Sequence, residues 1–132
     1  MYFSIPDLTE ISTRQNNHQQ TYTLYHIHLN GQHFCNLRYS QLRQFHDDLQ
    51  RLNHQMIVFP PKKLFNLSRR ELDERRLLLE RYLQSIIQNK TILSSNLFNQ
   101  FFLCAQYETM KSMLTSLTER VNLTVEFLNH EK

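Results

Sequence analysis

Apolar residues of the first forty positions are concentrated in three short segments, the second of which is rich in β-branched and aromatic residues. These segments predict three strands, over residues 2–9, 21–29 and 33–39, with a polar loop over residues 12–20. Asn30-Gly31 separates the second predicted strand from the third, and this dipeptide supplies the positive φ angles of a type I′ turn. The second and third strands are therefore predicted to form an antiparallel hairpin.

After Ser40 the apolar period becomes that of a helix. Four apolar residues recur on one predicted helix face: Leu42, Phe45, Leu49 and Leu52. They predict a first helix from Ser40 to about His54. Pro60-Pro61 then predicts an extended loop, because proline has no backbone N–H to donate within a helix or a central strand.

Further helices are predicted in the second half of the chain. Ser68-Arg69-Arg70-Glu71 has the spacing of a capping box and predicts a helix from Ser68 to about Asn89. Two more helices are predicted over residues 96–105 and 108–120. Apolar and polar residues alternate over residues 121–128 and predict a strand there. The pattern as a whole predicts an α+β fold with a three-stranded antiparallel sheet.

Composition narrows the possible classes of protein. A chain of 132 residues with 40% hydrophobic residues is long enough for one globular domain with a core. No stretch approaches the about 20 apolar residues of a membrane span, so membrane contact is expected to be peripheral. The start of the chain lacks the features of a signal peptide, so Cys35 and Cys104 are expected to be reduced thiols in the cytoplasm.

Charge and motifs argue against nucleic-acid binding and against catalysis. The net charge is only +3, and no basic strand or recognition helix with interleaved aromatic residues is present. The chain has one glycine, no Gly-x-Ser-x-Gly elbow and no His-Glu-x-x-His helix. We therefore expect neither an enzyme nor a cofactor.

Histidines on the predicted hairpin raise the possibility of a metal site. With a two-residue turn, His28 faces His33 and His26 faces Cys35, which puts four potential zinc ligands on one face. Structural zinc sites usually have tighter, cysteine-rich spacing, and neighbouring strand residues rarely converge as a tetrahedron. We therefore expect no metal site.

A set of basic and aromatic residues carries the functional signal. Arg38-Tyr39-Ser40 lies at a predicted junction of strand and helix, Phe59-Pro60-Pro61-Lys62-Lys63 forms the proline loop, and Arg75 precedes Tyr82 by seven residues. This succession resembles the PX (phox homology) domain. The resemblance covers residues 1–107 and implies a three-stranded antiparallel sheet packed against a helical subdomain, with the proline-rich loop between the first two helices.

The resemblance also implies a phosphoinositide site. Arg38 is expected to hold the 3-phosphate, Tyr39 to stack on the inositol ring, Lys62 to meet the 1-phosphate and Arg75 to bind ring hydroxyls, with Ser40 in the same set. Lys63 and Arg76 are expected to form a secondary basic rim. Leu64 and Phe65 could insert into the bilayer or plug the core.

Two segments resemble one group within the family. The opening Phe3-Ser4-Ile5-Pro6 and the loop over residues 59–65 are most similar to the sorting nexin 17 and 31 group, in which a FERM-like module follows the PX domain. Residues 108–132 are accordingly expected to be a linker helix and the first strand of a truncated FERM-like module. Receptor-tail cargo is then expected only for a full-length form that carries the complete module.

The function implied by the resemblance is binding of phosphatidylinositol 3-phosphate on early endosome membranes. The domain is expected to be a monomeric, peripheral module of an endosomal sorting adaptor that acts in receptor recycling and intracellular protein transport. The alternative is a protein-interaction scaffold of the same fold with little lipid affinity, which docks a partner through the Pro60-Pro61 loop or an apolar helix face. Loss of Arg38 should abolish the first function and leave the second unchanged.

Overall fold

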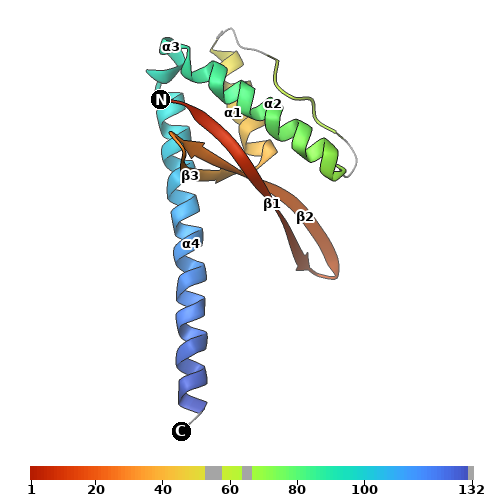
Figure 1. Cartoon of the computed structure of the whole chain (residues 1–132), viewed down its shortest axis with the longest axis vertical. Coiled ribbons are helices and arrows are strands. Elements are labelled where there is room, and N and C mark those ends of the chain that lie inside the picture. Colours follow the sequence, from red (N-terminus) through yellow and green to blue (C-terminus); the bar gives the residue numbers. More distant parts are fainter. Residues whose placement is uncertain (53–57, 64–66, 131–132) are drawn as a thin grey trace.

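A three-stranded antiparallel sheet lies against a set of helices in the computed structural model of the chain (Figure 1). The structure describes residues 1–52, 58–63 and 67–130. Its elements are β1 (Phe3–Gln15), β2 (His18–Leu29), β3 (Gln32–Leu37), α1 (Tyr39–Arg51), α2 (Arg69–Ile87), α3 (Lys90–Leu93) and α4 (Asn96–His130). The predicted α+β fold is confirmed, and α3 is a short helix that the sequence pattern did not predict.

Two tight turns connect the sheet in the order β1-β2-β3. Asn30 and Gly31 have φ angles of 52° and 79°, which confirms the predicted turn between β2 and β3. The polar loop predicted over residues 12–20 is wrong, because β1 and β2 stay paired as far as Gln15 and His18. Asn16 and Asn17 turn the chain there with φ angles of 52° and 63°, a conformation that asparagine tolerates. Polar residues suit this hairpin because it extends beyond the core into solvent.

A register shift between Ile27 and His28 changes the predicted histidine face. His28 does lie opposite His33, as predicted, but His26 lies opposite Asn36 rather than Cys35. Cys35 is instead buried in the core, and burial raises the pKa of its thiol to about 12. Among the described residues, no group of three or more histidine, cysteine or acidic side chains is arranged to hold a metal ion.

The core lies between the sheet and the helices, with α2 against β1 and α4 against β3. The stripe predicted for the first helix is buried at Leu42, Phe45 and Leu49, whereas Leu52, just after α1, is 56% exposed. Ser68 caps α2 as predicted, since its Oγ accepts a hydrogen bond of 3.2 Å from the Glu71 N–H. Phe59, from the proline loop, inserts between His46 and Tyr82 with ring centroids 5.0 and 4.9 Å away. The loop is thereby anchored to both α1 and α2.

The C-terminal quarter of the chain corrects the sequence prediction. Residues 96–130 form one continuous helix, so the break after residue 105 and the strand over residues 121–128 are wrong for this chain. A strand needs a neighbour for its backbone groups, whereas a helix satisfies them internally. Figure 1 shows α4 projecting well beyond the sheet, and no other element of the described residues lies beside its C-terminal part. The assignment of residues 108–132 to a FERM-like module stays a prediction.

Stability should depend on the face of α2 that meets the sheet. Leu79 is fully buried, so Leu79→Ala should lower the free energy of unfolding by about 2–5 kcal/mol through lost burial and the cavity left behind. Leu77 lies on the same helix but is 49% exposed, and Leu77→Ala should change stability by less than about 0.5 kcal/mol. Urea denaturation followed by circular dichroism measures both. Equal losses in the two variants would contradict the packing described here.

Candidate functional site

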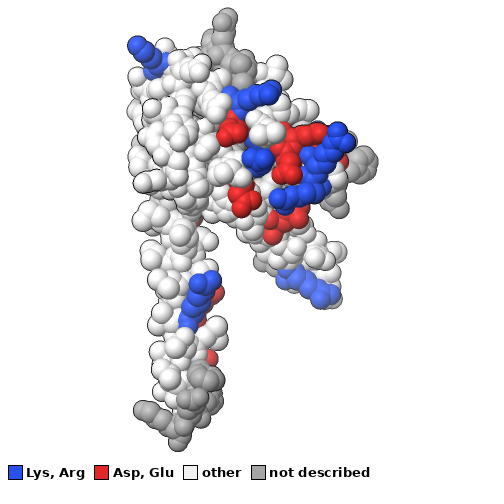
Figure 2. Space-filling view, in the orientation of Figure 1, with Lys and Arg blue, Asp and Glu red and all other residues white. Residues whose placement is uncertain are grey.

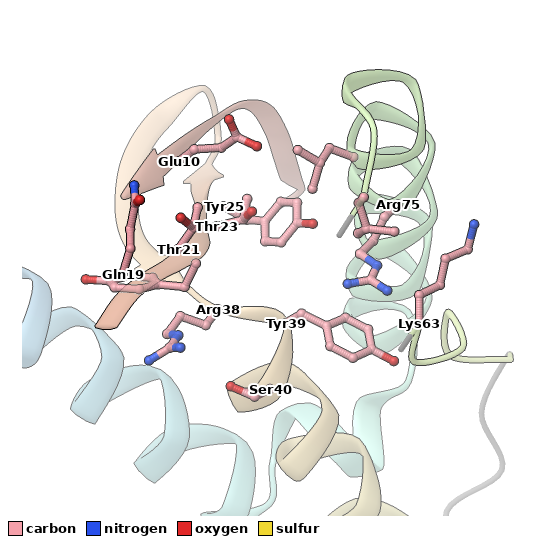
Figure 3. Close-up of a pocket in the computed structure, with 13 residues that line it drawn as sticks. Glu10, Gln19, Thr21, Thr23, Tyr25, Arg38, Tyr39, Ser40, Lys63 and Arg75 are labelled. Atoms are coloured by element: carbon pink, nitrogen blue, oxygen red, sulfur yellow. The ribbon is translucent and has the colours of Figure 1, made fainter. Parts of the chain in front are cut away.

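A cavity of about 680 Å³ lies between the β1–β2 hairpin and the N-terminal ends of α1 and α2 (Figure 3). The hairpin side contributes Glu10, Gln19, Thr21, Tyr22, Thr23 and Tyr25. The helices and the loops before them contribute Arg38, Tyr39, Ser40, Lys63, Leu67, Leu72 and Arg75. The fold therefore brings together four of the five predicted site residues, namely Arg38, Tyr39, Ser40 and Arg75.

Arg38 stands at the junction between β3 and α1. Its backbone N–H donates to Gln41 Oε1 at 2.8 Å, which fixes the start of the helix. Its guanidinium carbon lies 4.1 Å from the ring centroid of Tyr22, a cation–π contact. No carboxylate pairs with Arg38 among the described residues. The guanidinium is thus held by an aromatic face while its charge stays available to an anion.

Arg75 and Tyr39 form a second contact of the same kind. The Arg75 guanidinium carbon lies 4.0 Å from the Tyr39 ring centroid, and Arg75 Nη2 donates to the Pro61 carbonyl at 3.3 Å. Tyr39 Oη in turn donates to the Pro60 carbonyl at 2.5 Å. Proline carbonyls therefore hold both side chains, which explains why a rigid loop belongs to this site.

The two loop lysines differ in position. Lys63 lines the cavity and forms an ion pair with Glu71, whereas Lys62 is exposed and does not line it. The hydrogen bond from Lys63, helped by those from Ser68, lowers the pKa of the Glu71 carboxyl to about 2. Glu71 thus offsets the charge of Lys63, and the unpaired cations that line the cavity are Arg38 and Arg75.

The other predicted residues lie elsewhere. Arg76 Nη1 donates to the Ile5 carbonyl at 2.7 Å, and its Nε is 3.7 Å from Asp73, so Arg76 braces α2 against β1 and does not line the cavity. The predicted membrane insertion of Leu64 and Phe65 lies outside the described residues.

Sequence reasoning missed the hairpin wall of the cavity. Tyr25 is fully buried, and its hydroxyl faces the Arg75 guanidinium. Burial raises the pKa of this hydroxyl, while the nearby Arg75 guanidinium partly opposes the rise. Because side chains alternate along a strand, the sequence places Thr21, Thr23 and Tyr25 on one face of β2. The loop predicted over residues 12–20 was wrong, so the sequence did not predict that this face continues along the β1–β2 hairpin.

Comparison with protein families matches residues 25–105 to the PX domain. The chain belongs to the PX domain family. Sorting nexin-17 from Danio rerio is 40% identical over 134 aligned positions, which cover 100% of this chain and 27% of that protein. Sorting nexin-17 from Homo sapiens is also 40% identical, again over 27% of its length. Sorting nexin-31 from Homo sapiens is 39% identical over 89 positions, or 67% of this chain and 20% of that protein.

Solved structures agree with the PX fold. A designed CISK-PX domain has a TM-score of 0.62 at 27% identity and covers 76% of this chain and 97% of that structure. The mouse SNX19 PX domain, solved with a bound sulphate ion, has a TM-score of 0.60 at 22% identity and covers 78% of this chain and 95% of its own. The predicted PX architecture is therefore confirmed, while the chain spans about 27% of the length of the sorting nexin-17 proteins it matches.

Charge on the visible face of this PX domain is mixed. Figure 2 shows basic and acidic side chains interspersed over α2, where Arg69, Arg70 and Arg76 pair with Asp73 and Glu74. An exposed pair such as Arg70 with Glu74 contributes little to stability. None of the helices in the described part of the chain is both long enough and apolar enough to cross a membrane.

The ion pair between Lys63 and Glu71 predicts a pH dependence of stability. The pKa of Glu71 is lowered from 4.5 to about 2 in the folded chain, so its contribution is complete above pH 4.5 and is lost as the pH falls toward 2. Wild type should therefore be more stable than Glu71→Gln at pH 6, and the difference should shrink below pH 4.5. Urea denaturation of both proteins between pH 6 and 3 measures this difference. A constant difference over that range would contradict the pairing.

Proposed function

We propose that this PX domain binds phosphatidylinositol 3-phosphate and thereby attaches reversibly to early endosome membranes. The observation that carries the proposal is the pair of guanidinium groups, Arg38 and Arg75, that line one cavity and rest on aromatic rings instead of carboxylates. A phosphomonoester carries about −1.5 to −2 charges near neutral pH, which two such cations match.

The roles of the residues follow from their chemistry. A guanidinium donates two parallel hydrogen bonds to a phosphate, which suits Arg38 to the 3-phosphate. Ser40 lies in the first turn of α1, where unpaired backbone N–H groups favour an anion. Arg75 donates to ring hydroxyls, and Tyr39 packs against the ring.

The strength of such a site sets the kind of membrane attachment. Charge-assisted hydrogen bonds contribute about 1.5–3 kcal/mol each, so a few of them give an affinity in about the micromolar range. One head-group site of this strength gives transient attachment, and stable residence needs a second contact. The similarity to sorting nexin-17 and sorting nexin-31 supports an adaptor role in receptor recycling and protein transport. Receptor-tail cargo belongs to a full-length form with a complete FERM-like module.

Binding to vesicles tests the head-group site. Wild type should co-sediment with vesicles containing phosphatidylinositol 3-phosphate more strongly than with phosphatidylinositol or its 4,5-bisphosphate. Arg38→Gln should weaken that binding at least about tenfold, the effect of losing one charge-assisted contact. Arg70→Gln is the matched control, since Arg70 is 89% exposed on α2 and does not line the cavity. Equal effects of the two substitutions would reject the site.

Lys62 is proposed to contact the 1-phosphate at the membrane side of the cavity. This phosphate joins the inositol to glycerol, so it should lie toward the membrane rather than deep in the cavity. Lys62 precedes the lining residue Lys63 and is exposed, with no ion pair among the described residues. Lys62→Gln should weaken binding to vesicles about threefold to tenfold, as expected for one exposed cation near an anionic surface. Soluble head group without the 1-phosphate should bind wild type and variant equally. A difference with that soluble ligand would contradict the assignment.

The second candidate function is a protein-interaction scaffold, which one observation favours. Along α4, apolar side chains such as Met110, Leu114, Leu117 and Val121 are 53–60% exposed. Localisation in cells separates the candidates, because Arg38→Gln should disperse a lipid-directed domain and leave a scaffold in place.

A further inference from the structure

The two sides of the cavity differ in chemistry. Arg38 and Arg75 line one side, while the β1–β2 hairpin lines the other with uncharged residues and one carboxylate, Glu10. Figure 3 shows Glu10 and Thr23 on the strands across the cavity from Arg38 and Tyr39. A carboxylate is an unexpected group in a cavity that binds an anion, because it opposes the attraction of the two guanidinium groups.

The strand register fixes Glu10 on the cavity side. Leu8 pairs with Tyr25, Glu10 with Thr23 and Ser12 with Thr21, so these residues share one face of the hairpin. Leu8 and Tyr25 are buried, and the cavity begins where the core ends. A shift of one residue would turn Glu10 away from the cavity and expose Leu8, which the core does not permit.

The charge of Glu10 is not compensated within the protein. Its side chain forms no hydrogen bond or ion pair with the described residues. The carboxylate of Glu71, by contrast, is paired with Lys63. An ionised carboxylate only accepts hydrogen bonds. It therefore suits the hydroxyl groups of a ring, which donate, and it repels a phosphate, which carries about −1.5 to −2 charges.

We propose that Glu10 is a specificity-determining residue that accepts hydrogen bonds from ring hydroxyls and excludes a second phosphate from the hairpin side of the cavity. This inference rests on the proposed function and deepens it. The hydroxyls of Thr21 and Thr23 lie on the same face as further partners for a polyol. The ligand class is then an inositol ring that carries one phosphate inside the cavity, directed at Arg38, with its hydroxyl edge on the hairpin.

The test compares Glu10→Gln with wild type on vesicles that contain phosphatidylinositol 3-phosphate, 3,4-bisphosphate or 3,5-bisphosphate. Removing the carboxylate should raise binding to at least one bisphosphate about tenfold, because a second phosphate no longer meets a like charge. Binding to the 3-phosphate should change less than about threefold, since an amide oxygen still accepts from a hydroxyl. Titration with the corresponding soluble inositol phosphates separates recognition of the head group from attraction to the vesicle surface.

Glu126→Gln is the matched control. It makes the same change in net charge on an exposed part of α4, far from the lining residues, and it should leave the ratio of bisphosphate to monophosphate binding unchanged. Equal ratios for wild type and Glu10→Gln, or equal effects of the two substitutions, would overturn the role of Glu10 while the head-group site stands. If wild type fails to bind the 3-phosphate at all, the proposed function fails, and the inference fails with it.

Discussion

The contact between Arg75 and Tyr39 is the constraint on which the rest of the site depends. It joins α2 to α1, and the carbonyls of Pro60 and Pro61 hold the two side chains in place. None of these partners is acidic, so the guanidinium is positioned without losing its charge. A carboxylate would also fix an arginine, but it would cancel the charge that an anion needs. Lys63 shows this contrast within the same cavity, because Glu71 pairs with it.

Core and cavity share one continuous sheet face. Leu8 and Tyr25 are buried on one face of the hairpin, and Glu10 and Thr23 follow on the same face. The same strand pairing therefore determines both the core packing and the wall of the cavity. The Tyr25 hydroxyl lies at this boundary, buried and next to the Arg75 guanidinium. Because burial of Leu8 fixes the register, it also fixes which hairpin residues line the cavity.

The C-terminal segment illustrates that secondary structure depends on whether a neighbouring strand is available. Alternating apolar residues over 121–128 favour a strand, and the same residues form the end of α4 in this chain. Val121, Leu123 and Val125 are between 49% and 66% exposed there, so the helix gains little from packing. Its backbone is nevertheless satisfied internally, which no isolated strand achieves. An alternating pattern therefore predicts a strand only where a neighbouring strand is available to pair with it.

Local signals by themselves determined much of this domain. The turn at Asn30-Gly31 and the cap at Ser68 formed as predicted, because each acts within a few residues on its own backbone. The resemblance to PX domains predicted Arg38 and Arg75 for one site, and the fold brings both to one cavity. Tertiary structure alone decided the length of the β1–β2 hairpin, the register shift between β2 and β3, and which loop lysine lines the cavity. These features depend on contacts between residues far apart in the sequence, and local patterns do not encode the strand register or the path of a loop.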